Sequence, residues 1–336
     1  MEKWFSDIVM RMFRLMHDVH DDNFDAWRYR GASPNVFFPD THGDYLLFLE
    51  SHRREFFAAR SLLADDTSRS LFDELILFRL LGHLHVRLRT NTPEHRRARQ
   101  TVEQWRVGVA AHASDVYGAL ANYVVPIDDD ALCINCWPGN IAANFIWRQY
   151  YFDRDGVWIA PRVGDHALDV GGCFGDTALT FARSVGDRGH VYAFDPMPKH
   201  CEIMRENFAM NPALGERITL FDFGLSDRDS KGSEDARMGI DPGASLGDDL
   251  PTRTLDSLDL LRVDFVKMDV EGAELMALRE GEQSIRAFKP RMALSLYHRD
   301  EDFFSIPLWL EALGIGYRLH LDHYSIHREE TVLYAV

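Results

Sequence analysis

The residues most suited to chemistry lie in one short stretch, residues 166–177, which reads His-Ala-Leu-Asp-Val-Gly-Gly-Cys-Phe-Gly-Asp-Thr. The apolar residues before the glycines predict a buried strand, and a helical pattern follows until Gly186 ends it. Glycines let the backbone approach a ligand closely because no Cβ intervenes. The stretch therefore predicts a ligand-binding turn between a strand and a helix. Its candidate binding residues are Asp169, Gly171, Gly172, Gly175, Asp176 and Thr177.

A second acid, Asp195, closes the apolar run 191–194, and Pro196 prevents that strand from continuing. In nucleoside-binding βαβ units, the acid after the second strand accepts hydrogen bonds from ribose hydroxyls. The first turn does not have the G-x-G-x-x-G spacing, because Cys173 stands where the second glycine would be. Dinucleotide binding is therefore disfavoured.

Length and composition limit the class of protein. A chain of 336 residues is expected to form about two domains of ~150 residues each. Charged residues interrupt the N-terminus and no apolar run reaches ~18 residues, so we expect a cytoplasmic protein without a membrane span. Four cysteines are too few for a disulfide scaffold. We interpret Cys133 and Cys136 as ordinary thiols, with a redox pair or half of a zinc site as alternatives.

The net charge of -16 is concentrated in the C-terminal part of the chain. Residues 151–336 hold 20 Lys and Arg against 33 Asp and Glu. A surface this acidic repels phosphate backbones. Nucleic acid is therefore not an expected partner.

The pattern of the chain predicts three segments. Residues 1–125 are expected to form a helical domain that includes further helix over 96–123. This domain would cover the acceptor or serve oligomerisation, with a homodimer through the N-terminal helices as one option. The first ~20 residues have an apolar side at helical spacing, which we assign to packing on a neighbour and not to membrane binding. Residues 126–163 connect to the third segment, 164–336, and include a bridging helix over 141–151.

The third segment alternates strands with helices, which indicates an α/β fold with a doubly wound parallel sheet. Two last strands, 317–321 and 331–336, suit an antiparallel hairpin and bring the sheet to seven strands. A parallel sheet closed by such a hairpin is the strand plan of class I methyltransferases. The five earlier strands are expected at 166–170, 190–195, 217–224, 263–269 and 291–298, and the helices at 176–185, 198–210 and 273–287.

The block 266–274, Val-Lys-Met-Asp-Val-Glu-Gly-Ala-Glu, resembles the FkbM family of S-adenosylmethionine-dependent methyltransferases. The resemblance covers about residues 150–336 and includes the first turn, the strand ending at Asp195, Thr254-Leu-Asp256 and a strand ending in Tyr297-His298. Many members have Glu in place of Asp195 and Ala-Asn in place of Gly172-Cys173. Both departures keep an acid and a tight turn, so the expected cofactor-binding site is retained. The resemblance implies a Rossmann-like methyltransferase domain that uses S-adenosylmethionine as cofactor.

The resemblance also implies methylation of an oxygen, but the acceptors of the family are diverse and the resemblance does not give the acceptor. We expect a hydroxyl on a small molecule, a natural product or a glycan. Such a reaction needs an oriented acceptor and a group that takes its proton. His298 is our expected general base, because an imidazole accepts protons near neutral pH. Asp269 and Glu271 would orient the acceptor or the cofactor's ammonium, although a capping or salt-bridge role is equally consistent with their positions. Asp169 and Asp195 are expected to bind the cofactor, and Asp222 and Gly224 to read the adenine edge.

Two alternative functions remain open at this point. One is an N-methyltransferase acting on an amine, a protein or RNA, and the other is a non-catalytic cofactor-binding interaction protein. We predict no metal site, although the C-terminal part contains oxygen and imidazole ligands that are expected to face solvent. These residues are His298, Asp300, Asp302, His320, His323 and His327.

Overall fold

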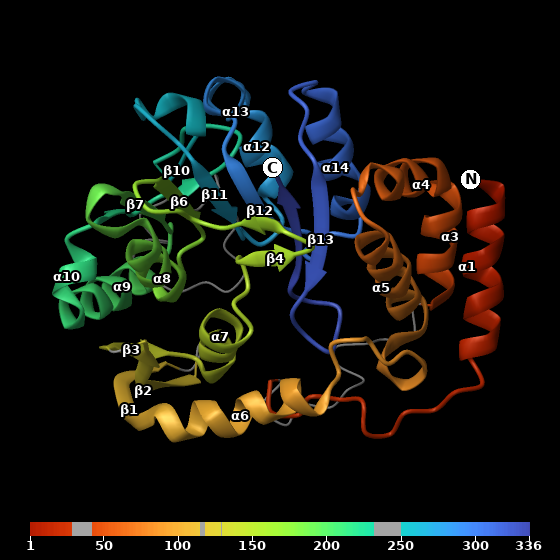
Figure 1. Ribbon diagram of the computed structural model, residues 1–336, viewed down its shortest axis with the longest axis horizontal. Coiled ribbons are helices and arrows are strands. Elements are labelled where there is room, and N and C mark those ends of the chain that lie inside the picture. Colours follow the sequence, from red (N-terminus) through yellow and green to blue (C-terminus); the bar gives the residue numbers. More distant parts are fainter. Residues whose placement is uncertain (29–41, 115–117, 129, 232–249) are drawn as a thin grey trace. The chain divides into compact units, whose positions relative to one another are not determined.

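The computed structural model describes residues 1–28, 42–114, 118–128, 130–231 and 250–336 (Figure 1). The chain divides into two compact units. The first combines Met1–Arg96 with Leu296–Ala335, and the second consists of Arg97–Ser295 with Val336. The predicted boundary near residue 125 therefore differs from the observed division. The reason is that helices and strands from both ends of the chain pack together in the first unit.

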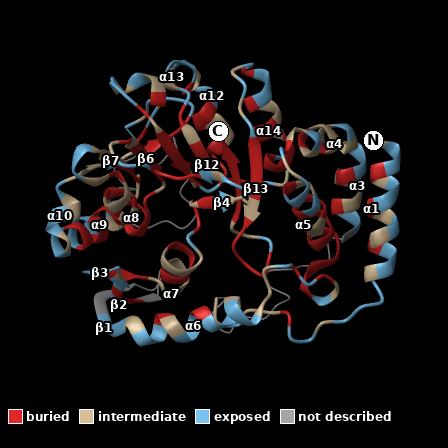
Figure 2. Ribbon diagram, in the orientation of Figure 1, coloured by how far each residue is buried: buried red, intermediate tan, exposed pale blue. Residues whose placement is uncertain are grey.

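The second unit is built on five parallel strands in the order β12-β11-β6-β7-β8. Adding the antiparallel pair β13 and β14 gives the seven-stranded order β13-β14-β12-β11-β6-β7-β8, so the predicted α/β class and its closing hairpin are confirmed. Most residues of the parallel strands are buried (Figure 2), as expected for strands covered on both faces. The strands are β6 (His166–Val170), β7 (His190–Phe194), β8 (Ile218–Phe221), β11 (Phe265–Met268), β12 (Arg291–Ser295), β13 (Leu319–His323) and β14 (Thr331–Ala335).

Helix α8 (Asp176–Val185) packs on β6, β7 and β8 and follows directly from the glycine turn. The apolar face of α8 is buried, and the helix ends at Gly186, which has a φ of 64°. Both the predicted helix and its predicted C-terminal end are therefore confirmed. Further helices and short strands of this unit surround the sheet or connect its strands. They are α7 (Pro138–Ile141), η1 (Ala142–Ile146), β4 (Phe152–Arg154), β5 (Val157–Ile159), η2 (Gly186–Arg188), α9 (Pro198–Met210), α10 (Pro212–Gly215), β9 (Gly224–Leu225), β10 (Thr252–Arg253), η3 (Leu255–Ser257), α12 (Glu274–Arg279) and α13 (Glu282–Phe288).

The helix predicted over 96–123 is wrong beyond Trp105. Helix α6 (Pro93–Trp105) is followed by an antiparallel three-stranded sheet of β1 (Arg106–Ser114), β2 (Gly118–Ile127) and β3 (Asp130–Cys136). Glycine disfavours helix and valine favours extended backbone, so the Val-Gly-Val run at 107–109 suits a strand. Helix α9 holds this sheet through Asn207, whose Oδ1 accepts from the Asn135 backbone N–H at 2.8 Å.

In the first unit, four N-terminal helices pack together with helix α14 (Asp302–Ala312) and the C-terminal hairpin. The four helices are α1 (Glu2–Leu15), α3 (His42–Ser51), α4 (Arg53–Leu62) and α5 (Asp66–His85). Asp73 of α5 joins three elements, because it accepts from Trp4 Nε1 at 2.8 Å and from two Arg60 nitrogens at 2.7 and 2.9 Å. The rings of Phe56 and Phe304 pack edge to face with centroids 5.1 Å apart. Among the described residues, no helix combines the length and apolar character that a membrane span requires.

Three histidines of the C-terminal hairpin are buried, contrary to the expectation that they face solvent, and so is Asp302, whose Oδ2 accepts from the Arg299 backbone N–H at 3.1 Å. Each histidine has a polar partner within the first unit, which explains how it is accommodated. His320 Nδ1 lies 2.7 Å from an Asp65 carboxylate oxygen, and His323 Nδ1 lies 2.9 Å from the Thr331 hydroxyl. His327 Nε2 accepts from the Asp25 backbone N–H at 3.0 Å. These imidazoles therefore stabilise the hairpin through hydrogen bonds to neighbouring backbone and side-chain groups.

Burial lowers the pKa of His323 and of His327 to about 3. As the pH falls below ~6.5, the unfolded imidazole takes up a proton that the folded one does not. The contribution of the two histidines to the unfolding free energy is therefore fully present above about pH 6.5 and is lost progressively as the pH falls toward 3. We expect each histidine to remove about 2 kcal/mol of unfolding free energy between pH 7.5 and 5.0. Urea denaturation at the two pH values measures this loss.

The variant His323→Gln has one titrating group fewer, so its stability should fall by about 2 kcal/mol less than that of the wild type over this interval. His17→Gln, at an exposed position, is the matched control and should follow the wild type. An equal loss in His323→Gln and wild type would show that His323 titrates normally in the folded protein.

Candidate active site

The turn between β6 and α8 requires glycine at its two ends. Gly171 and Gly175 have φ of 83° and 80°, in the left-handed region that glycine tolerates best. A Cβ on Gly171 would lie 1.9 Å from the backbone oxygen of Asp269. The backbone N–H groups of Gly171 and Gly172 donate to the Phe194 carbonyl at 2.9 and 3.0 Å. The predicted turn is thus held against the carboxyl ends of β7 and β11.

Asp169 lies beneath this turn and is fully buried. Its Oδ2 accepts from the Thr177 hydroxyl at 2.6 Å, and its Oδ1 lies 3.1 Å from Lys267 Nζ. Asp169 and Lys267 are paired residues in the register of β6 with β11. Lys267 also donates to the Gly171 carbonyl at 2.5 Å. The carboxylate predicted to bind the cofactor therefore supports the turn from below.

Lys267 was not among the predicted site residues, although a lysine inside an apolar strand is a recognisable signal. Its side chain is buried. Burial alone would lower the pKa of its ammonium, but the charges of Asp169, Asp269 and Asp176 outweigh burial and raise that pKa above its ordinary value. The ammonium therefore stays charged in the centre of the sheet.

Asp195 ends β7 as predicted, and its carboxylate is already held by the protein. Oδ2 accepts from the Cys173 backbone N–H at 2.9 Å, and Oδ1 accepts from the Met197 backbone N–H at 2.9 Å. His200 Nδ1 donates to the same carboxylate at 3.0 Å. Burial would lower the pKa of His200, but the Asp195 charge outweighs it and raises that pKa. Asp195 and His200 thus form an acid–imidazole pair beside the glycine turn.

The segment 142–151 supplies two site residues that sequence reasoning missed. Asn144 Nδ2 donates to Asp176 Oδ2, and the Tyr150 hydroxyl donates to Asp269 Oδ2 at 2.8 Å. The helix predicted over 141–151 is instead a π-helix, η1, followed by Arg148 and Tyr150 at positive φ of 54° and 77°. Such interruptions are frequent at functional sites. No local motif marked either side chain, because each reaches a carboxylate far along the chain.

Asp176 begins α8 and is buried. Burial raises the pKa of its carboxyl group to about 6. Among the acids of the turn it is the one bound by the amide side chain of Asn144. Its protonation therefore responds to pH close to neutrality.

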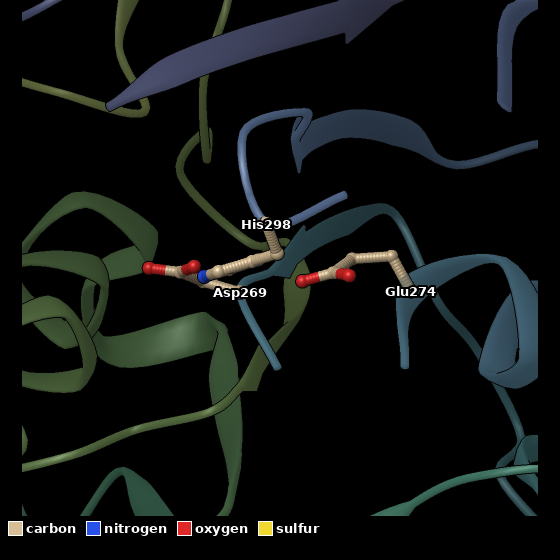
Figure 3. Close-up of side chains that lie close together, drawn as sticks. All are labelled: Asp269, Glu274 and His298. Carbon is tan, nitrogen blue, oxygen red and sulfur yellow. The ribbon is translucent and has the colours of Figure 1, made fainter. Parts of the chain in front are cut away.

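The remaining predicted residues lie after other strands of the sheet. Asp222 follows β8 and is exposed, and Gly224 begins β9 and is buried. Glu271 is exposed at φ 53°. Figure 3 shows Asp269 after β11, Glu274 at the start of α12 and His298 after β12. In the described part of the chain, Asp269, Glu274 and His298 each offer one atom that could bind a metal ion. These three atoms lie within 4.8 Å of one another.

Comparison with known proteins identifies the domain that carries this turn. Residues 169–319 match the family described as Methyltransferase FkbM domain, which confirms the predicted family. The structure is similar to that of Methyltransferase FkbM from Methylobacillus flagellatus KT, with a TM-score of 0.58 and 16% sequence identity. That alignment covers 91% of this chain and 63% of the other, and at this identity it shows the fold alone.

Two curated relatives match a shorter segment. Both are described as ubiquinone/menaquinone biosynthesis C-methyltransferase UbiE, one from Vibrio campbellii and one from Vibrio parahaemolyticus. Each is 33% identical over 70 residues, which is 21% of this chain and 26% of the relative. The chain thus spans about a quarter of the length of these relatives.

Replacing Lys267 should show how far the buried ion pair supports the fold. In Lys267→Met the Asp169 carboxylate keeps its burial and loses its cation, so we expect the unfolding free energy to fall by about 3 to 5 kcal/mol. In the double variant Lys267→Met/Asp169→Asn no charge is left unpaired, and the loss should be smaller than in Lys267→Met. Urea denaturation followed by circular dichroism measures both. A single variant within about 1 kcal/mol of the wild type would contradict this role.

Proposed function

We propose, from the membership of residues 169–319 in the FkbM methyltransferase family, that the protein transfers a methyl group from S-adenosylmethionine to a hydroxyl. The acceptor class that we propose is a small molecule, a natural product or a glycan. The family match at the glycine turn is the observation that carries the proposal. The turn, its acids and the following helix lie at the carboxyl ends of the parallel strands, where ligands bind in open α/β sheets.

The residues of the turn fit the cofactor. Gly171 and Gly175 let the turn pack closely against the Asp269 backbone and the Phe208 ring. The N-terminus of α8, which follows this turn, favours a carboxylate such as that of the methionine part. Asp195 is proposed to accept a hydrogen bond from a ribose hydroxyl, as acids at this position do in nucleoside-binding units. Asp222 and Gly224 are proposed to border the adenine. When bound, the cofactor supplies a methyl group activated by its attachment to a positively charged sulfur.

The chain's own residues would orient the acceptor and take its proton. His298 is the proposed general base, because it follows the end of β12 by three residues, at the ligand-binding edge of a parallel sheet. Asp269 and Glu271, which follow β11, are proposed to hold the acceptor hydroxyl or the cofactor's ammonium. Tyr150 would fix the Asp269 side chain through its hydroxyl hydrogen bond. Much of the rate acceleration would then come from orientation.

The cofactor assignment predicts selective ligand binding. S-adenosylmethionine and its demethylated product should each raise the melting temperature, and NADH should not, because the turn does not have the dinucleotide spacing. A ligand specific for the native state adds about 2.7 kcal/mol at 100 times its dissociation constant. Differential scanning fluorimetry measures the shift. An equal shift with NADH, or none with either methyl-cycle compound, would refute the assignment.

The proton-transfer role is tested with His298→Ala. We expect unchanged cofactor affinity and a methylation rate lower by about 10²- to 10⁴-fold, the range typical of a lost general base. Fractionated extract with isotope-labelled cofactor supplies the acceptor, and carbon-13 NMR of the labelled product tells an O-methyl from an N- or C-methyl group. His166→Ala is the matched control, because His166 lies at the amino end of β6, on the opposite edge of the sheet. A folded His298→Ala protein with wild-type turnover would exclude His298 as the base.

A further inference from the structure

The buried acids around the glycine turn differ in what balances their charge. Asp169 is paired with the ammonium of Lys267, and Asp195 is paired with His200. Asp176 is bound instead by the neutral amide of Asn144 and by its own backbone N–H. Only 2% of Asp176 is exposed, so water screens its charge little. Asp176 therefore contributes a buried negative charge next to the turn.

The ionisable groups that act on Asp176 come from several elements. Asp169 of β6 and Lys267 of β11 influence it with opposite charges, and these two are already paired with each other. The thiols of Cys136 in β3 and Cys173 in the turn are the other titratable neighbours. Burial raises the pKa of both thiols well above the usual range, so they remain neutral. The charge of Asp176 is thus in excess in this part of the site.

We propose that Asp176 is a specificity-determining residue that makes the site favour S-adenosylmethionine over its demethylated product. This inference rests on the proposed function. The two ligands share the adenosine, the ammonium and the carboxylate, and they differ in one methyl group and one positive charge on sulfur. When the methyl group leaves, the electron pair of the broken carbon–sulfur bond stays on sulfur, which becomes a neutral thioether. A fixed negative charge attracts the cationic sulfur and has no such charge–charge attraction to the neutral thioether.

The variant Asp176→Asn removes the charge and nearly keeps the shape. Isothermal titration calorimetry with each ligand should show the dissociation constant for S-adenosylmethionine raised about tenfold, an effect within reach of a charge–charge interaction in a protein interior. Any effect on the shared carboxylate and ammonium appears in both constants, so the ratio of the S-adenosylmethionine constant to the product constant should rise, because only S-adenosylmethionine carries a charged sulfur. Asp153→Asn, which makes the same change at an exposed position of β4, is the matched control and should leave both constants unchanged.

The pH dependence of the wild type provides a second, independent measurement. Because burial raises the pKa of Asp176 to about 6, its negative charge is present above that pH and is lost below it. The preference for S-adenosylmethionine should therefore shrink as the pH falls from 8 to 5, and Asp176→Asn should show no such change. Titration of His200 acts through Asp195 and the ribose, which both ligands share. Its effect is therefore the same for both ligands and cancels in the ratio of their dissociation constants.

The outcomes separate the two proposals. A ratio of the two dissociation constants that is the same in Asp176→Asn and wild type, and constant with pH in the wild type, would overturn the role of Asp176. If Asp176→Asn does not fold or binds neither ligand, the wild-type pH series decides alone, and a constant ratio overturns the role. A wild-type protein that binds neither ligand would instead refute the cofactor assignment on which the inference rests.

Discussion

The buried pair of Asp169 and Lys267 is the interaction on which the site depends. Two charges removed from water are costly, and they persist in an apolar sheet only when they meet each other and further hydrogen-bonding groups. Here the register of β6 with β11 sets them side by side, and Lys267 continues to the Gly171 carbonyl. The Lys267 ammonium therefore couples the alignment of the two central strands to the conformation of the ligand-binding turn.

Local patterns predicted the turn and its helix well, because all their determinants lie close together in the sequence, between Gly171 and Gly186. Gly171, Gly175 and Gly186 each occupy a backbone conformation that favours glycine, and their spacing fixed both ends of α8. The parallel direction of the five central strands followed from their alternation with helices. The closing hairpin followed from a short polar loop between two apolar runs.

Sequence reasoning failed where long-range partners decide the structure. The β1–β3 sheet was predicted partly as helix, because pairing between strands and packing on α9 override a weak helical pattern. Asn144 and Tyr150 escaped notice because their partners, Asp176 and Asp269, lie 32 and 119 residues away. The hairpin histidines were expected in solvent, since nothing in the sequence shows that Asp65, Thr331 and the Asp25 backbone receive them.

The division of the first unit between the two ends of the chain has a consequence for how the protein is made. Residues 97–295 are continuous and hold nearly all of the second unit, so this part can fold as soon as it leaves the ribosome. Helices α4 and α5 are synthesised before this stretch, whereas α14 and the hairpin, against which they pack, are synthesised after it. The apolar faces of α4 and α5 therefore lack these partners until α14 and the hairpin have been synthesised, and in this interval they are open to aggregation and to chaperone binding.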